Sequence, residues 1–411
     1  MKSKLKNVFI SFILIGILIN VEAAENRYPK IKKITARSVD NNVNKPENNK
    51  NSVDHHNNTV IKKVIKKDSS ISSYPKVQSW NKNMTLLRIS NRLYNANTLE
   101  ESSLTSKYFS NSTAYKGLCS RYSDYFRWSN TQSDIFYVLN SSQQFVRGEI
   151  TDNTVDCTNV IQSFAEYELV HMGPYEGNID YNDKYVVFIA KKSHRDNVYV
   201  ILFDIEEEKR VWTKELRNNK WLNIKGKWEI SSLDWLSVSP SGKYILINER
   251  DKGMYRYDIN FKNRVKLQYK YKNKLHTQGG HGDMGYDMDG NEVFVQFIAG
   301  LGIYQFSLEN PKERGKKIFN LYGGGHVSCR NSERRGWCYI TTHKEKYRDV
   351  FALKLDGSED EMVQNFTQSH MLADLDKIYG GPSPDGTMVI FNSDWGSNNK
   401  SKIDTFVVTT Y

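Results

Sequence analysis

The stretch GGGHVSCRNSERRGWCYITTH, residues 323–343, gathers residue types that carry chemistry in many proteins. Its His326, Cys329, Cys338 and His343 would suit tetrahedral zinc if all four side chains pointed to one place. His326 and Cys329 are three positions apart, however, and residues at that spacing on a strand face opposite sides. Three interpretations therefore stay open: a disulfide between Cys329 and Cys338 across a hairpin, two free thiols, or zinc.

Two histidines stand at nearly the same distance before a turn. His281 lies nine residues before Gly290, and His326 lies ten residues before Gly336. Glycines surround both, in GGHGDMG and GGGHVSC, and allow tight bends or the close approach of a ligand. Two imidazoles at one level can bind a divalent cation such as Mn, Ca or Zn, or act as acid and base. Such imidazoles can also form hydrogen bonds with neighbouring strands or with water in a central channel. We interpret His281 and His326 as candidate metal or substrate ligands.

The elements that position these residues follow a period. After residue 76, short alternating strands separated by Gly, Asp and Asn turns dominate the chain. Turn signals before an apolar strand recur at intervals of 51, 49, 59, 48, 46 and 50 residues. They stand at Asn83, Asp134, Asp183, Gly242, Gly290, Gly336 and Gly386. The period predicts an all-β fold, a seven-bladed β-propeller of four-stranded antiparallel blades in which the strand before each turn is innermost. A pair of β-sandwiches is the alternative, but it does not predict a sustained period.

In other repeat units, polar residues stand at about the same distance before the turn as His281 and His326 do. The third unit carries Glu176 there, and the fourth carries Asp234 followed by Trp235, so we assign these three to substrate binding. Three further residues lie near the ends of expected strands and are suited to proton transfer or to pairing with a carboxylate. They are His171, His194 and Arg250. We interpret both histidines as catalytic and the arginine as a carboxylate clamp, and ordinary loop roles are the alternative.

The N-terminal residues predict export. Residues 1–23 join a basic start to an apolar run too short to span a bilayer, as a cleaved signal peptide does. Residues 24–75 are rich in Asn, Lys and Ser and predict a disordered linker, so residues 76–411 form the predicted propeller. We expect a secreted or periplasmic monomer with no transmembrane segment after removal of the signal. In an exported chain, Cys119 and Cys157 can also pair.

The net charge of +11 lies mostly outside the predicted propeller. Residues 1–23 carry +2 and residues 24–75 carry +6, which leaves +3 for residues 76–411. A nearly balanced folded part gives no reason to expect a nucleic-acid partner.

Several stretches resemble exported bacterial propellers related to oligogalacturonate lyases and, more loosely, to ulvan lyases. These stretches are WNKNMTLLRI, HGDMGYDMDGNEVFVQF, GGHVSCRN with RRGW, DVFALKLDG and GGPSPDGTMVIFNSDWG. The resemblance covers nearly all of residues 76–411. It implies a polysaccharide or similar cell-surface polymer as partner, and cleavage of uronic-acid units by β-elimination. In that reaction a base removes the C5 proton while a metal or arginine neutralises the adjacent carboxylate.

The resemblance also implies roles for particular residues. In oligogalacturonate lyases a manganese ion is held by histidines on successive inner strands, and His281 and His326 correspond to two of them. Those lyases carry a glutamine and a His-x-His before their last Pro-Ser turn, where this chain has Gly380 and Gly381.

The ulvan-lyase pattern has no catalytic metal and uses histidines with a tyrosine and an arginine. His171, His194 and Arg250 correspond to its histidines and arginine, while Asp234 or Trp235 stands in the tyrosine's place. The rival hypothesis, from another functional class, is a non-catalytic propeller that binds protein or cell-wall partners.

Overall fold

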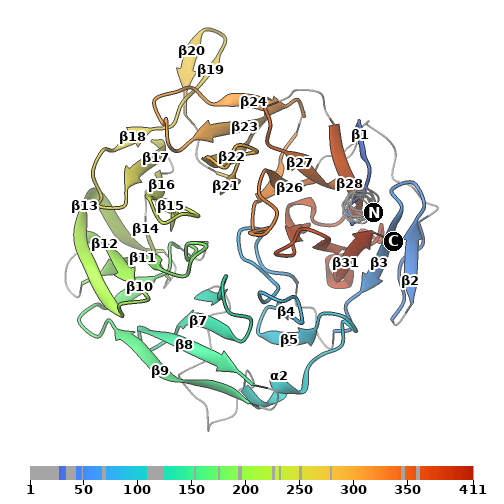
Figure 1. The fold of residues 1–411 in the computed structure, drawn as a ribbon, viewed down its shortest axis with the longest axis horizontal. Coiled ribbons are helices and arrows are strands. Elements are labelled where there is room, and N and C mark those ends of the chain that lie inside the picture. Colours follow the sequence, from blue (N-terminus) through green and yellow to red (C-terminus); the bar gives the residue numbers. More distant parts are fainter. Residues whose placement is uncertain are drawn as a thin grey trace, which may run out of the picture.

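The computed structural model arranges antiparallel sheets around a central axis (Figure 1). The structure describes residues 27–33, 43–48, 50–66, 71–108, 125–151, 154–174, 176–192, 197–224, 227–230, 233–249, 252–277, 280–321, 323–343, 348–357 and 362–410. Within these ranges, no helix is long and apolar enough to cross a membrane.

Four sheets in the middle of the chain follow the predicted four-stranded plan, and one of them carries an additional strand. They consist of β6 (Phe126–Trp128), β7 (Ile135–Leu139), β8 (Gln144–Ile150) and β9 (Val155–Ser163); β10 (Leu169–His171), β11 (Tyr185–Lys191), β12 (Asn197–Asp204), β13 (Lys209–Ile224) and β14 (Lys227–Ile230); β15 (Leu233–Val238), β16 (Tyr244–Glu249), β17 (Gly253–Asp258) and β18 (Val265–Lys266); and β21 (Gly282–Tyr286), β22 (Glu292–Ile298), β23 (Gly302–Ser307) and β24 (Lys316–Phe319). The second strands β7 and β22 are buried along their whole length because both faces of each sheet pack against a neighbour.

N-terminal residues complete the last two sheets. These consist of β25 (Gly325–Ser328), β26 (Trp337–Thr342), β27 (Asp349–Lys354) and β28 (Met362–Gln368) with β1 (Ile31–Lys33); and β29 (Gly381–Pro382), β30 (Met388–Ser393) and β31 (Asp404–Thr410) with β3 (Thr59–Lys63) and β2 (Asn51–Asp54). The prediction of a disordered linker over residues 24–75 is wrong for these strands. The physical reason is that the last unit supplies only three strands of its own, so the free edge of β31 takes β3, and Ile61 becomes fully buried.

The remaining elements are short. They are β4 (Leu86–Ile89) and β5 (Arg92–Asn95), with isolated bridges from Trp80 to Leu87 and from Tyr94 to Glu101; the hairpin β19 (Tyr269–Tyr271) and β20 (Lys274–His276); the helix α2 (Ser103–Tyr108); and the 3-10 turns η3 (Leu375–Lys377) and η4 (Lys400–Lys402). The β19–β20 hairpin projects outward from the ring (Figure 1).

The hydrophobic core lies between neighbouring sheets. One cluster joins Val295 and Phe297 of β22 to Val327 of β25 and Ile340 of β26. Such sheet-to-sheet packing around an axis is the arrangement that the sequence period predicts. The turn glycines agree with it: Gly242, Gly290, Gly336 and Gly386 have φ values of 76°, 84°, 81° and 73°, a region that favours glycine. The predicted all-β fold with repeated four-stranded antiparallel sheets is confirmed.

Candidate functional site

The segment between β3 and β4 runs through the middle of the ring (Figure 1). This central segment, residues 72–78, contacts the innermost parts of several sheets. The backbone N–H of Ser72 donates to Asn392 Oδ1 at 3.0 Å, and Ser328 Oγ donates to the carbonyl oxygen of Pro75 at 2.6 Å. Because the central segment is bonded to the last two sheets by these contacts and to Asn178, between β10 and β11, by another, its side chains are held at the ring centre.

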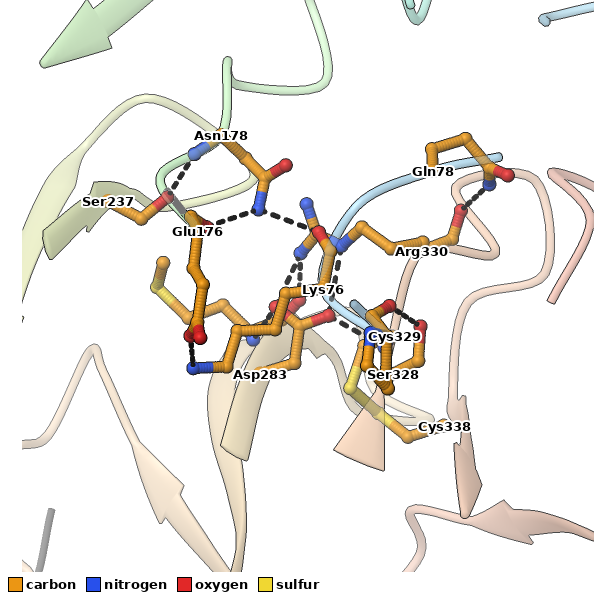
Figure 2. A network of polar contacts seen from close by, with 12 residues as sticks. Lys76, Gln78, Glu176, Asn178, Ser237, Asp283, Ser328, Cys329, Arg330 and Cys338 are labelled. Carbon is orange, nitrogen blue, oxygen red and sulfur yellow. Dashed lines mark hydrogen bonds and ion pairs between the residues drawn. A yellow bond between two sulfur atoms is a disulfide. The ribbon is translucent and has the colours of Figure 1, made fainter. Parts of the chain in front are cut away.

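Lys76 is the buried charge of the central segment (Figure 2). Its Nζ lies 2.6 Å from Glu176 Oε2, and only 3% of its side chain is exposed. The same ammonium group sits 4.3 Å from the ring centroid of Trp235. Asn178 Nδ2 donates to the Lys76 carbonyl oxygen at 2.9 Å. A buried ammonium group needs such partners because desolvation of an unpaired charge is costly.

Imidazole and phenol side chains meet beside Lys76. The rings of His281 and His326 are 4.7 Å apart between centroids, at an interplanar angle of 84°. The Tyr74 hydroxyl shares a hydrogen bond of 2.9 Å with His281 Nδ1, in which the donor depends on the tautomer of the histidine. The Tyr74 ring is also 5.2 Å from the His326 ring. Two sheets and the central segment thus converge on one cluster.

His343 and Tyr379 extend this cluster around His326. Their ring centroids lie 5.8 Å and 5.4 Å from that of His326. His343 Nδ1 lies 3.0 Å from Asp376 Oδ1, and the Asp376 side chain is 82% exposed, which places solvent at this edge. Gly324 makes the approach possible, since a Cβ there would stand 2.1 Å from His343 Nε2.

The imidazoles of the cluster are held in the neutral state. Burial lowers the pKa of His326 well below its ordinary value of 6.5, and His281, His343 and Lys76 lower it further. Loss of surrounding water lowers the pKa of His281, as does the Lys76 charge. The pKa of His343 is also lowered by burial, against the opposing effect of Asp376. Neutral imidazoles can accept protons at neutral pH.

Burial acts on the tyrosines in the opposite sense. It raises the pKa of Tyr74 far above its ordinary value, and the nearby carboxylates of Glu176 and Asp234 add to the effect. Burial likewise raises the pKa of Tyr379. Both phenols therefore keep their protons and can act as donors.

A disulfide and a buried ion pair support the strand that carries His326. Cys329 and Cys338 form a disulfide with their Cα atoms 4.4 Å apart. The Cys329 N–H donates to Asp283 Oδ2 at 2.8 Å, and Arg330 pairs with the same carboxylate at 2.9 Å. This outcome settles the three interpretations left open, and the zinc interpretation is wrong because both sulfur atoms are bonded to each other. Cys157 is also disulfide-bonded, while Cys119 lies outside the described residues.

The structure brings some of the predicted site residues together. His281 and His326 meet directly, and Glu176 and Trp235 meet them through Lys76. Asp234 accepts a hydrogen bond from Asn248 Nδ2 at 2.7 Å. Their functional roles remain predictions.

The predicted catalytic residues lie elsewhere or outside the described ranges. His171 is 7% exposed at the end of β10, where its Nδ1 shares a hydrogen bond with the Tyr125 hydroxyl. Burial lowers the pKa of His171 to about 4. His194 and Arg250 lie outside the described residues.

Sequence reasoning missed the contribution of the central segment. Tyr74 falls inside the predicted linker and Lys76 at its boundary, and Tyr379, next to Gly380, was not assigned to the site. A signal was nevertheless present: YPKVQSW, residues 74–80, is aromatic and apolar in a way that the preceding Asn- and Lys-rich stretch is not.

The described residues do not fit a bound divalent metal. Among them, no group of three or more His, Cys, Asp or Glu side chains is arranged to hold one. His281 Nδ1 is bonded to Tyr74, and the Lys76 ammonium group lies close enough to lower the pKa of both His281 and His326. At Gly380, a Cβ would stand 2.1 Å from Thr341 Cγ2, so no ligand side chain can replace this glycine without displacing that threonine.

Comparison with solved structures identifies the architecture. One similar structure is described as oligogalacturonate lyase in complex with manganese; it matches with a TM-score of 0.58 and 12% identity, over 93% of this chain and 98% of that chain. An oligogalacturonate lyase from Vibrio parahaemolyticus matches with a TM-score of 0.56 and 11% identity, over 93% and 98%. The chain has the fold of these lyases. Identity this low shows the fold alone, and no family model or curated protein matches the sequence.

Proposed function

We propose that this chain is an exported seven-bladed propeller that binds a uronic-acid-containing polysaccharide and cleaves it by metal-free β-elimination. The observation that carries the proposal is the hydrogen bond between Tyr74 and His281 inside a cluster of neutral imidazoles at the ring centre. The secreted or periplasmic location and the monomeric state are part of this proposal. The signal-like residues 1–23 support export.

The pair has the components of a proton relay. In the tautomer with the proton on Nδ1, His281 donates to the Tyr74 oxygen and its Nε2 is free to accept the C5 proton of the sugar. The electron pair of the broken C5–H bond forms the C4–C5 double bond, and the C4–O bond breaks. The Tyr74 hydroxyl protonates the leaving oxygen and recovers a proton from His281 Nδ1. His281 ends in its other neutral tautomer, so no net charge is created.

The test is an assay of purified protein on a panel of polymers, which comprises polygalacturonate, ulvan, alginate and hyaluronan. New C4–C5 double bonds absorb in the ultraviolet, and we expect turnover on one of these polymers. Tyr74→Phe removes the proton donor but keeps the ring, and should lower turnover by about 100-fold or more. His276→Ala, on the projecting hairpin, serves as the control. Absence of product from every polymer would refute the catalytic proposal.

A second candidate is a non-catalytic propeller that binds a polymer or protein partner. The observation in its favour is that the central segment fills the ring centre, where Lys76 is only 3% exposed. This candidate predicts saturable binding of a panel polymer with no turnover. The same purified protein distinguishes the two outcomes.

A further inference from the structure

The charges at the ring centre carry an inference that rests on the proposed function and deepens it. We propose that Lys76 supplies the positive charge that pairs with the ligand's carboxylate. It has the role that a divalent cation would otherwise have. The ligand class is a uronic-acid unit with an ionised carboxylate. The site then recognises this group without a bound metal.

Lys76 is a preorganised charge. Its ammonium group is fixed by Glu176 at 2.6 Å and by the Trp235 ring at 4.3 Å. Its backbone is fixed as well, because Asn178 donates to its carbonyl oxygen and Ser328 to that of Pro75. An ammonium group removed from water attracts an anion more strongly than one on the surface, because the surrounding dielectric constant is lower.

Glu176 shows how a carboxylate meets this ammonium group. Its side chain is 23% exposed, against 3% for Lys76, so Glu176 is the partner with access to water. A ligand carboxylate that takes its place leaves Glu176 hydrated and keeps Lys76 paired. The exchange conserves the charge of the buried site, which avoids the cost of leaving an ammonium group alone.

Lys76 also stands next to the proposed proton relay. Its Nζ is 5.5 Å from the ring centroid of Tyr74, whose hydroxyl bonds to His281. A uronate carboxylate paired with Lys76 presents the neighbouring C5 proton on the side of Tyr74 and His281. The ammonium group then stabilises the negative charge that develops on the carboxylate as the proton leaves. The same positive charge opposes binding of a divalent cation at these imidazoles.

The test measures binding of trigalacturonate and of an ulvan oligosaccharide by titration calorimetry. Lys76→Met alone leaves Glu176 without its partner, so the double variant Lys76→Met/Glu176→Gln is measured beside it, and thermal unfolding checks each fold. We expect both Met-containing variants to bind about 10- to 100-fold more weakly than wild type. Glu176→Gln alone should bind more tightly, because no internal carboxylate competes. Lys274→Met, on the projecting hairpin, is the matched control and should bind as wild type.

The same titrations decide between Lys76 and a metal. We expect EDTA to leave wild-type binding unchanged and Mn²⁺ to give no stoichiometric binding. Equal affinity in wild type and in the folded double variant would overturn the inference, and so would loss of wild-type binding in EDTA that Mn²⁺ restores. Failure of the proposed function is a different result, in which wild type binds neither oligosaccharide; the inference would fall with it.

Discussion

Two tyrosine–histidine pairs in the described part of this ring share a hydrogen bond, and their surroundings differ. At the end of β10, Tyr125 shares a hydrogen bond with His171 in a core cluster of apolar and aromatic residues. At the ring centre, Tyr74 shares a hydrogen bond with His281, and a second imidazole, His326, lies 4.7 Å away. The pair alone therefore does not make a site. A site also needs neighbouring groups that can transfer protons or carry charge.

The electrostatics of the two regions follow from this difference. Burial alone lowers the pKa of His171 to about 4. At the centre, burial lowers the pKa of His326 together with the charges of His281, His343 and Lys76. Burial is the cause that lowers the pKa of His171, whereas the central groups act on one another, so substitutions in the two regions should have effects of different kinds.

The largest expected effect is a difference in turnover between variants of the two tyrosine–histidine pairs. His281→Ala removes the proposed base and should lower turnover on the active polymer by about 10²- to 10⁴-fold. Tyr125→Phe removes only the hydroxyl near His171 and should change turnover less than about twofold. Initial rates of double-bond formation measure both. A large loss of activity in Tyr125→Phe, with the fold intact, would move the catalytic assignment back to His171.

The second prediction concerns stability at acidic pH. The unfolded chain takes up a proton on His171 near pH 6.5, but the folded protein does so only at about pH 4, so stability falls as the pH drops through this interval. The loss attributable to His171 is about 3 kcal/mol. Urea unfolding at pH 7.5 and pH 4.5 measures it. His171→Leu cannot titrate and should lose correspondingly less over the same interval, whereas an equal loss would contradict a neutral buried His171.

The third prediction tests the support of the central region. Cys329→Ser/Cys338→Ser removes the disulfide after His326 and should lower the free energy of unfolding by about 2–3 kcal/mol, because the unfolded chain is no longer constrained. Denaturant unfolding measures the change, and reducing agent added to wild type is the independent check, although it also opens the disulfide of Cys157. Unchanged stability in both would show that Asp283 and Arg330 suffice to hold this strand.

The smallest expected effect concerns the pH dependence of turnover. Because the pKa of His281 is lowered, activity should be retained down to a pH below 6.5 and lost as His281 becomes protonated. The charge of Asp376, whose side chain is 82% exposed, raises the pKa of His281, so Asp376→Asn should move the acid limb lower by a few tenths of a pH unit. Rates measured from pH 4.5 to 8 test the shift. A shift in the opposite direction would exclude His281 as the titrating group.

Local chemistry made much of the fold predictable. The turn glycines and the alternation of strand residues act within one unit, so their period predicted repeated antiparallel sheets. The same count from the turns put His281 and His326 at one level, and the structure brings them together. The disulfide was one of three open interpretations because a hairpin register depends on the turn, which spacing alone does not specify.

The contribution of the N-terminal residues was not predictable in this way. β3 pairs with β31 across almost the whole length of the chain, and nothing in the composition of residues 24–75 indicates that pairing. This segment is poor in apolar residues, but β3 is ordered because it pairs with the free edge of β31 and because Ile61 is buried there.

By itself, the sequence determined the strand period and the level of the two inner histidines, because turns and alternation are properties of neighbouring residues. Only the tertiary structure decided what meets these histidines. Tyr74 and Lys76 reach them because closure of the ring carries the central segment through its middle, where one backbone is held by several sheets at once. Contacts made across the axis depend on the closed ring, and no local pattern encodes them.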